Sequence, residues 1–375
     1  MQYRRFGQTN LPLSVFSLGT MRYLSAEETA VQTVQRALEL GINHIETASG
    51  YGNSELYLGK VLNLVRQSGL KLPYVTTKLS PTASADDMAR ALEQSLTRLG
   101  LDAVDCLAIH GLNTWEHLAW IEDSQGCMAA LRRAVDQGLV KHLGFSTHAP
   151  LEIILRAIQT DQFGFVNLHY YYFNQRNRRA VELAASKDMG IFIISPADKG
   201  GLLHSPSAAL AQLCQPFTPL ALTYRFLLSD PRITTLSVGA AIPQELDILV
   251  GLDDTAPLTA LEQNALERLQ AQLQQSLGTE RCSQCYECLP CPEQIQIPEV
   301  LRLRNLAVAY DMTSFGQYRY RMFENAGHWF PGRKANRCTD CGDCLPRCPE
   351  QLDIPTLLRD THARLNGAPR RRLWE

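Results

Sequence analysis

Residues 41–62 read GINHIETASGYGNSELYLGKVL. The segment 42–48 is short and β-rich, the following loop is polar and contains glycine, and the segment 54–63 has helical character. The stretch therefore predicts one strand followed by one helix, joined by a loop that carries polar side chains. The fold follows from how often this unit is repeated.

Seven further pairs of the same kind occur in the first 280 residues. Continuous apolar strands separated by amphipathic helices imply a parallel sheet covered by helices, and eight units in about 280 residues fit a closed barrel. A doubly wound open sheet usually carries a glycine-rich phosphate fingerprint in its first strand–helix turn, which this chain lacks. We therefore predict an α/β fold, a (β/α)8 TIM barrel, with strands over 15–21, 42–48, 74–79, 103–111, 141–148, 164–172, 191–198 and 233–239.

The composition limits the classes of partner. The chain has 375 residues, 45% of them hydrophobic, and its 36 Lys and Arg against 38 Asp and Glu give a net charge of −2. Such a balance provides no general attraction to nucleic acid or to an anionic membrane. No apolar run approaches the length of a membrane span, and the opening MQYRRFGQTN lacks the apolar core of a signal peptide. We expect a cytoplasmic protein.

Polar residues follow several of the predicted strands. Glu46 and Tyr51 come after the second strand, Lys78 lies at the end of the third, and His110 at the end of the fourth. Because the strands of a parallel barrel all end at the same face, these side chains are expected to meet in one mouth.

Several ordered motifs resemble the aldo-keto reductase family. They are the opening YRRFGQTNLPLSVFSLGTM, the stretch 41–62, TTKL, CLAIHG, KHLGFSTH and IFIISPADKGGLL, and together they span roughly residues 1–255. The resemblance implies a catalytic tetrad of Glu46, Tyr51, Lys78 and His110, in which Glu46 stands where the family normally has Asp. Each residue taken alone could instead be an ordinary surface or strand-end side chain.

This tetrad suits carbonyl reduction, which produces an alkoxide that must receive a proton. Tyr51 would be the acid, although free tyrosine titrates near 10. The Lys78 ammonium would lower the pKa of Tyr51, Glu46 would hold that ammonium, and His110 would orient the carbonyl oxygen.

The resemblance also implies a nicotinamide site around the seventh and eighth strands. Ala241, Ile242 and Pro243 offer no cation for a 2′-phosphate, and Leu249 stands where an Asn is expected near adenine. We therefore predict that NADP(H) or NAD(H) binding is weakened or altered. The candidate contacts, which strand capping and turn formation would explain equally well, are Ser146, Asn167, Lys199 and Gly239.

Eight of the eleven cysteines lie in two runs near the C-terminus, each closed by Cys-Pro: Cys282, Cys285, Cys288 and Cys291, then Cys338, Cys341, Cys344 and Cys348. The second run has bacterial ferredoxin spacing, so the two runs predict two [4Fe-4S] clusters in a ferredoxin-like domain. The last cysteine of each run, Cys291 or Cys348, would ligate the other cluster. Four thiolates on each of two zinc ions are the alternative.

The cysteine distribution divides the chain into a barrel over 1–280 and a mainly α-helical iron–sulfur domain over 281–375. Residues 296–330, between the runs, are expected to form one or two amphipathic helices. Basic residues of this domain would dock an acidic redox partner or form a solvated face: Arg302, Arg304, Arg319, Arg321, Arg333, Lys334 and Arg337.

Three functions are consistent with these two parts. The first is an oxidoreductase acting on an organic carbonyl or alcohol, with single electrons exchanged through the clusters and a ferredoxin-like redox protein. The second is an NAD(P)H-dependent carbonyl reductase whose clusters are structural or sense oxidants. The third is a catalytically silent electron-transfer subunit. A hydride carries two electrons, whereas a [4Fe-4S] cubane transfers one at a time. No flavin motif is visible in the sequence that could couple the two-electron and one-electron steps.

Overall fold

The computed structural model describes residues 1–23, 26–252 and 257–367. These residues form two compact units. The first consists of Met1–Gly200 and Thr223–Pro257, and the second of Gly201–Leu222 and Leu258–Glu375. The expected iron–sulfur domain includes residues 368–375, which lie outside the described residues.

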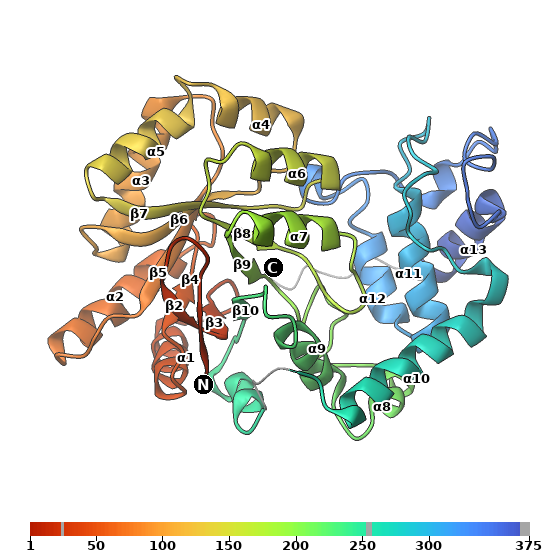
Figure 1. Cartoon of the computed structure of the whole chain (residues 1–375), viewed down its shortest axis with the longest axis horizontal. Coiled ribbons are helices and arrows are strands. Elements are labelled where there is room, and N and C mark those ends of the chain that lie inside the picture. The colour runs from red at the N-terminus through yellow and green to blue at the C-terminus, as the bar shows by residue number, and fades with distance from the viewer. Residues whose placement is uncertain (24–25, 253–256, 368–375) are drawn as a thin grey trace. The chain divides into compact units, whose positions relative to one another are not determined.

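The first unit contains a closed barrel of eight parallel strands, which confirms the predicted (β/α)8 fold (Figure 1). The barrel closes where β10 pairs with β3, with Leu236 opposite Phe16. In chain order the strands are β3 (Phe16–Gly19), β4 (His44–Glu46), β5 (Tyr74–Leu79), β6 (Val104–His110), β7 (Val140–Ser146), β8 (Phe165–Leu168), β9 (Gly190–Ile193) and β10 (Thr235–Val238).

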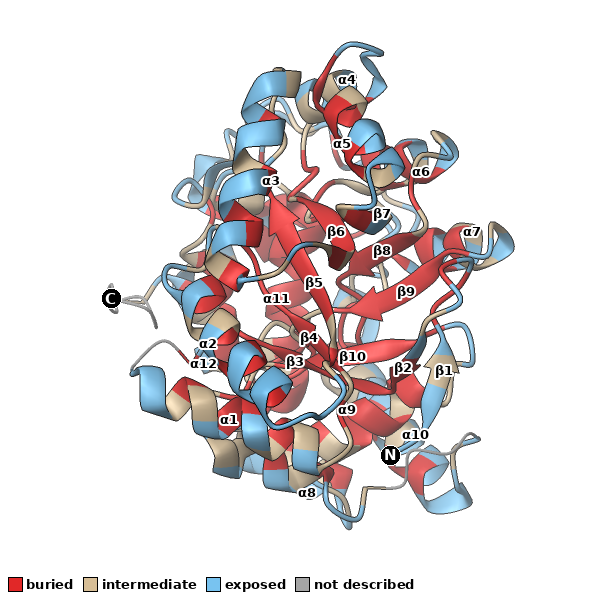
Figure 2. Ribbon diagram, turned by 90° about the vertical axis from the view of Figure 1, so that its left-hand side faces the viewer, coloured by how far each residue is buried: buried red, intermediate tan, exposed pale blue. Residues whose placement is uncertain are grey.

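Amphipathic helices follow the strands and bury one face each (Figure 2). In α3, Met88, Leu92 and Leu96 recur at a spacing of four and are buried, while the Ser84 side chain accepts a hydrogen bond from the Asp87 N–H and caps the helix. The helices of the barrel strands are α1 (Glu27–Glu39), α2 (Ser54–Gln67), α3 (Ala85–Leu99), α4 (Trp115–Glu122), α5 (Cys127–Asp136), α6 (Leu151–Gln159), α7 (Arg178–Ser186) and α9 (Pro219–Leu228). A 3-10 helix, η1 (Pro243–Leu249), follows β10.

A two-stranded hairpin that the strand pattern did not predict precedes the barrel. It consists of β1 (Tyr3–Arg5) and β2 (Pro12–Ser14), which pair antiparallel. Phe6 follows β1 and packs in a buried cluster with Phe165 and Phe192. A Cβ atom on Gly190 would lie 2.3 Å from the Phe6 ring, so a residue without a side chain is required at the start of β9.

The second unit is helical. Tyr310 ties its helices together, because its hydroxyl donates to the Leu269 carbonyl at 2.8 Å and its own carbonyl accepts from Ser207 Oγ at 2.6 Å. Its helices are α8 (Ala208–Cys214), α10 (Ala260–Leu277), α11 (Ile297–Tyr310), α12 (Thr313–Tyr320) and α13 (Ile354–Leu365), with short 3-10 helices at Gly278–Glu280, Gly327–Trp329 and Ala335–Arg337.

This grouping differs from a division at residue 280, because α8 and α10 pack with the helices of the second unit. The boundary at 280 as a limit of independent folding stays a prediction.

Three of the basic residues expected on a solvated or docking face are buried. Arg302 pairs with Glu299 at 3.2 Å, Arg304 pairs with Asp360 at 2.7 Å, and the Arg319 guanidinium lies 4.2 Å from the centroid of the Phe330 ring. The helix α11 that carries two of them is buried on most of its surface, so these arginines stabilise the interior of the unit instead.

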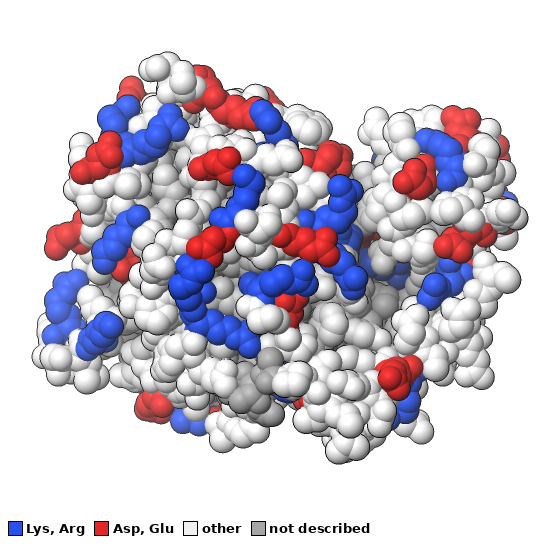
Figure 3. Space-filling view, in the orientation of Figure 1, with Lys and Arg blue, Asp and Glu red and all other residues white. Residues whose placement is uncertain are grey.

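Basic and acidic side chains are interspersed over the face seen in Figure 3, in agreement with the nearly balanced net charge. Within the described ranges, no helix combines the length and the apolar character needed to cross a membrane.

Candidate active site and iron–sulfur cavities

The four tetrad candidates lie at one end of the barrel. Glu46 is the last residue of β4, Lys78 is the fifth residue of β5, and His110 ends β6. Tyr51 lies in the β4–α2 loop, which is fixed to β5 because the Ser49 N–H donates to the Lys78 carbonyl at 3.1 Å. Parallel pairing of these adjacent strands brings their carboxyl ends together.

Glu46 and Lys78 form a buried ion pair. Their side chains are only 5% and 2% exposed, and Lys78 Nζ donates to Glu46 Oε1 and, at 2.9 Å, to the Thr47 carbonyl. Asn167 Nδ2 donates to the same carboxylate oxygen at 3.3 Å. The additional methylene of Glu46, relative to Asp, therefore does not prevent contact with the ammonium.

Tyr51 lies against both Lys78 and His110. Lys78 Nζ is 4.7 Å from the centroid of the Tyr51 ring, and the Tyr51 and His110 rings meet edge to face with centroids 5.4 Å apart. The pKa of Tyr51 is raised well above 10, first by burial and then by the charge of Glu46. This corrects the expectation of a lowered pKa, because burial disfavours the phenolate and the negative charge of Glu46 disfavours it further. Tyr51 therefore remains protonated at neutral pH.

His110 is neutral under the same conditions. Burial lowers its pKa to about 3, and the positive charges of Lys78 and Lys199 act in the same direction. A neutral imidazole offers one N–H donor and one acceptor, which suits it to orient a carbonyl oxygen without protonating it.

His44, at the start of β4, leads to a prediction about stability. It is fully buried, its Nδ1 lies 2.7 Å from Ser17 Oγ, and its Nε2 lies 2.7 Å from Thr76 Oγ1. Burial, followed by the charge of Lys78, lowers the pKa of His44 to about 3. As the pH falls below about 6.5 the unfolded chain binds a proton at this residue and the folded chain does not. This residue therefore lowers the free energy of unfolding by about 2 kcal/mol at pH 5.

Urea unfolding followed by circular dichroism at pH 8 and pH 5 measures this loss. His44→Gln should unfold with a weaker pH dependence than the wild type. An equal dependence in both proteins would contradict the assignment.

The candidate nicotinamide contacts occupy the next strands. Ser146 ends β7 and is paired in register with Asn167 of β8, and both are buried. Asn167 Oδ1 is a buried acceptor that has no hydrogen-bond partner among the described residues. A carboxamide amine would supply the missing donor, so this part of the site fits a nicotinamide. Lys199, in the turn after β9, lies near enough to His110 to lower the pKa of that imidazole.

The structure also brings a cation to the loop after β10 that the local sequence did not reveal. Arg22, from the loop after β3, donates to the Gly239 carbonyl at 2.7 Å and to both Glu245 carboxylate oxygens, at 2.8 and 3.1 Å. The first and last strands of a closed barrel are neighbours, so a polar residue after the first strand was a candidate for this loop. The pairing of the first and last barrel strands, and not the composition of the loop after β10, was the signal that could have identified Arg22.

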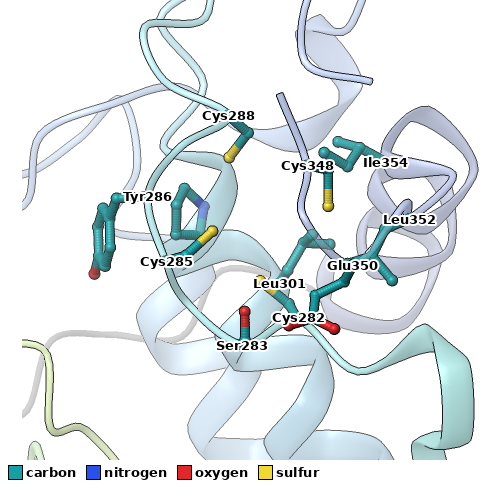
Figure 4. A pocket seen from close by; sticks show the side chains of 11 residues that line it. Cys282, Ser283, Cys285, Tyr286, Cys288, Leu301, Cys348, Glu350, Leu352 and Ile354 are labelled. Carbon is teal, nitrogen blue, oxygen red and sulfur yellow. The ribbon is translucent and has the colours of Figure 1, made fainter. Parts of the chain in front are cut away.

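The eight cysteines of the two runs line two cavities, and each cavity contains members of both runs. Cys282, Cys285 and Cys288 of the first run share a cavity with Cys348, as Figure 4 shows. The second cavity is lined by Cys338, Cys341, Cys344 and the last cysteine of the first run, Cys291. The last cysteine of each run therefore lines the cavity of the other run, and crossed ligation by Cys291 and Cys348 stays a prediction.

Hydrogen bonds to main-chain carbonyls and a β-bridge connect the segments that carry the two cysteine runs. Arg347 donates to the Pro290 carbonyl at 3.0 Å and to the Asp343 carbonyl at 2.8 Å, and thereby links the runs. Ile295, which follows the first run, forms a parallel β-bridge with Arg333, which precedes the second run. These contacts place each cavity between two distant segments of the chain.

Each cavity is lined by four cysteines, which is the ligand set of a [4Fe-4S] cluster. A cubane contacts each thiolate through a different iron, so its four sulfur ligands need not converge on one point. Burial raises the pKa of Cys282 to about 11 and of Cys288 to about 12, so cationic irons would be needed to stabilise these thiolates.

Comparison with known proteins agrees with both halves of this architecture. Residues 16–271 match the Aldo/keto reductase family, and residues 281–352 match a 4Fe-4S dicluster domain. L-galactose dehydrogenase of Arabidopsis thaliana is 26% identical over 313 residues, covering 73% of this chain and 95% of that protein. An aldo-keto reductase of Mycolicibacterium vanbaalenii is 31% identical over 270 residues, covering 67% of this chain and 89% of that protein.

A solved aldo-keto reductase from Bacillus halodurans, in its holo form, shares the fold with a TM-score of 0.63 at 21% identity. The aligned region covers 72% of this chain and 96% of the solved chain. The match to the family extends over more than half of the present sequence. The chain therefore belongs to the aldo/keto reductase family, and it is an oxidoreductase that carries a C-terminal 4Fe-4S dicluster domain.

Proposed function

We propose that the barrel reduces or oxidises a small organic carbonyl or alcohol, with Tyr51 as the proton donor and acceptor. The observation that carries this proposal is the contact of Tyr51 with both Lys78 and His110 at the carboxyl ends of adjacent strands. Neutral His110 orients the substrate oxygen, Glu46 fixes the Lys78 ammonium over the phenol ring, and the protonated Tyr51 donates to the developing alkoxide.

A nicotinamide would supply the hydride when bound. Asn167 would accept a hydrogen bond from its carboxamide through the unpartnered Oδ1, and Ser146 lies beside it on β7. Lys199 and Gly239 belong to the loops after the seventh and eighth barrel strands, which often hold phosphates in such barrels.

The second unit would hold two [4Fe-4S] clusters, one in each four-cysteine cavity, and these would supply single electrons. We propose that they exchange these electrons with a ferredoxin-like redox protein, and that the protein works in the cytosol, where thiols stay reduced. A second candidate function is an NAD(P)H-dependent carbonyl reductase with structural or sensing clusters, and the retained Ser146 and Asn167 favour it. A silent electron-transfer subunit is the remaining alternative.

One experiment distinguishes these functions. The full-length protein is purified without oxygen, and its clusters are followed by spectroscopy during titration with dithionite, NADPH and NADH. Clusters that dithionite reduces and NAD(P)H leaves oxidised support an external electron donor. Carbonyl turnover with NAD(P)H that persists after cluster removal supports the second function. Failure to bind a dinucleotide, together with the absence of turnover, would contradict both catalytic functions.

A further prediction concerns the choice of dinucleotide. The wild-type protein should bind NADPH weakly and with little preference over NADH, because residues 241–243 supply no cation and Arg22 is already paired with Glu245. A lost charge-assisted hydrogen bond corresponds to about 10- to 100-fold in affinity. Calorimetric titration with both dinucleotides measures the preference, and submicromolar NADPH binding with strong selectivity would contradict it.

A further inference from the structure

The loop after β10 holds a carboxylate in a position suited to an anionic ligand. Glu245 lies on η1, and its Oε2 accepts the Ala241 N–H at 3.0 Å and Arg22 NH1 at 2.8 Å. Its Oε1 accepts Arg22 NH2 at 3.1 Å, which completes a two-pronged guanidinium–carboxylate contact. A guanidinium fork together with a backbone N–H is also the donor set that proteins use to bind phosphate.

The position of this donor set in the barrel agrees with that use. β9 and β10 are the seventh and eighth barrel strands, and the loops that follow these strands often bind phosphate in (β/α)8 barrels. Gly239 leaves the approach open, because a Cβ atom there would meet only the Arg22 Cδ, at 3.8 Å.

We propose that Glu245 is an internal competitor for a phosphate-binding site formed by Arg22 and the Ala241 N–H. In the wild type the carboxylate satisfies both donors and repels a phosphate, so Glu245 lowers the affinity for a phosphate group of the dinucleotide. This inference rests on the proposed nicotinamide site, and it adds the residue that determines how phosphate is selected there.

The test compares two substitutions on η1 that each remove one negative charge. Glu245→Gln keeps the shape of the side chain and frees the Arg22 guanidinium. Asp247→Asn is the matched control, because Asp247 pairs with a different arginine, Arg36, at 2.9 Å. Calorimetric titration of the full-length proteins with NADPH and NADH should show about 10-fold tighter binding, or more, for Glu245→Gln and no change for Asp247→Asn.

The two dinucleotides identify which phosphate is bound. A gain for NADPH alone assigns the site to the 2′-phosphate, and an equal gain for both assigns it to the shared pyrophosphate. Adding Arg22→Gln to Glu245→Gln should remove the gain. The absence of a gain, or an equal gain in Asp247→Asn, would overturn the proposal.

Inorganic phosphate separates this proposal from the proposed function. If no dinucleotide binds any variant, but phosphate binds Glu245→Gln more tightly than the wild type and the double variant, the anion site stands and the nicotinamide site fails. If phosphate binds all three proteins equally, the internal competitor is wrong.

Discussion

Replacing Tyr51 with Phe should lower kcat for carbonyl reduction by on the order of 100-fold or more, with little change in KM. The substitution removes only the hydroxyl and keeps the ring that packs edge to face on His110 and under Lys78 Nζ. The alkoxide then lacks its proton donor while the pocket keeps its shape. Steady-state rates with a panel of small aldehydes and ketones measure the effect.

Tyr57→Phe is the matched control, because it removes a phenolic hydroxyl from α2, outside the contacts that surround Tyr51. Since the pKa of Tyr51 lies well above 10, the wild-type rate should also not decline through loss of the Tyr51 proton between pH 7 and 9. An unchanged rate in Tyr51→Phe would show that another group donates the proton.

The protein isolated without oxygen should contain about eight irons and eight sulfides, and loss of one ligand should reduce the iron content to about four. Cys341→Ser removes a ligand from the second cavity and should also make residues 281–367 easier to cleave by protease, because a cluster stabilises a loop-rich segment. The barrel should stay folded. Iron and sulfide analysis with limited proteolysis checks both expectations.

Cys127→Ser is the control, because Cys127 is buried in α5 and belongs to neither cavity. Two zinc ions without sulfide in the wild type, or first cleavage inside the barrel of Cys341→Ser, would contradict the assignment.

Because each cavity contains cysteines of both runs, the structure also predicts which cluster is lost when Cys348 is replaced. Cys348 belongs to the second run in sequence but lines the cavity of Cys282. In Cys348→Ser the surviving cluster should therefore have the electron paramagnetic resonance spectrum seen in Cys282→Ser, and not that seen in Cys341→Ser. The opposite match would show that each run ligates its own cluster.

Most of the fold could be predicted from the sequence because it depends on local periodicity. Short apolar segments that alternate with amphipathic ones determine strands and helices, and eight such units with parallel pairing close into a barrel. The strand-end positions of Glu46, Lys78 and His110 then place them at one end of the barrel, since all parallel strands end there. Cysteine spacing likewise indicated the iron–sulfur runs before any contact was known.

Only the tertiary structure decided which distant groups meet and how burial changes their chemistry. The Arg22–Glu245 contact joins residues 223 positions apart, and the exchange of Cys291 and Cys348 between cavities depends on how two segments pack. Burial together with Glu46, and not the neighbouring Lys78, determines the direction of the Tyr51 pKa. Local pattern specifies elements, whereas desolvation and long-range charge depend on the packed arrangement of the whole barrel.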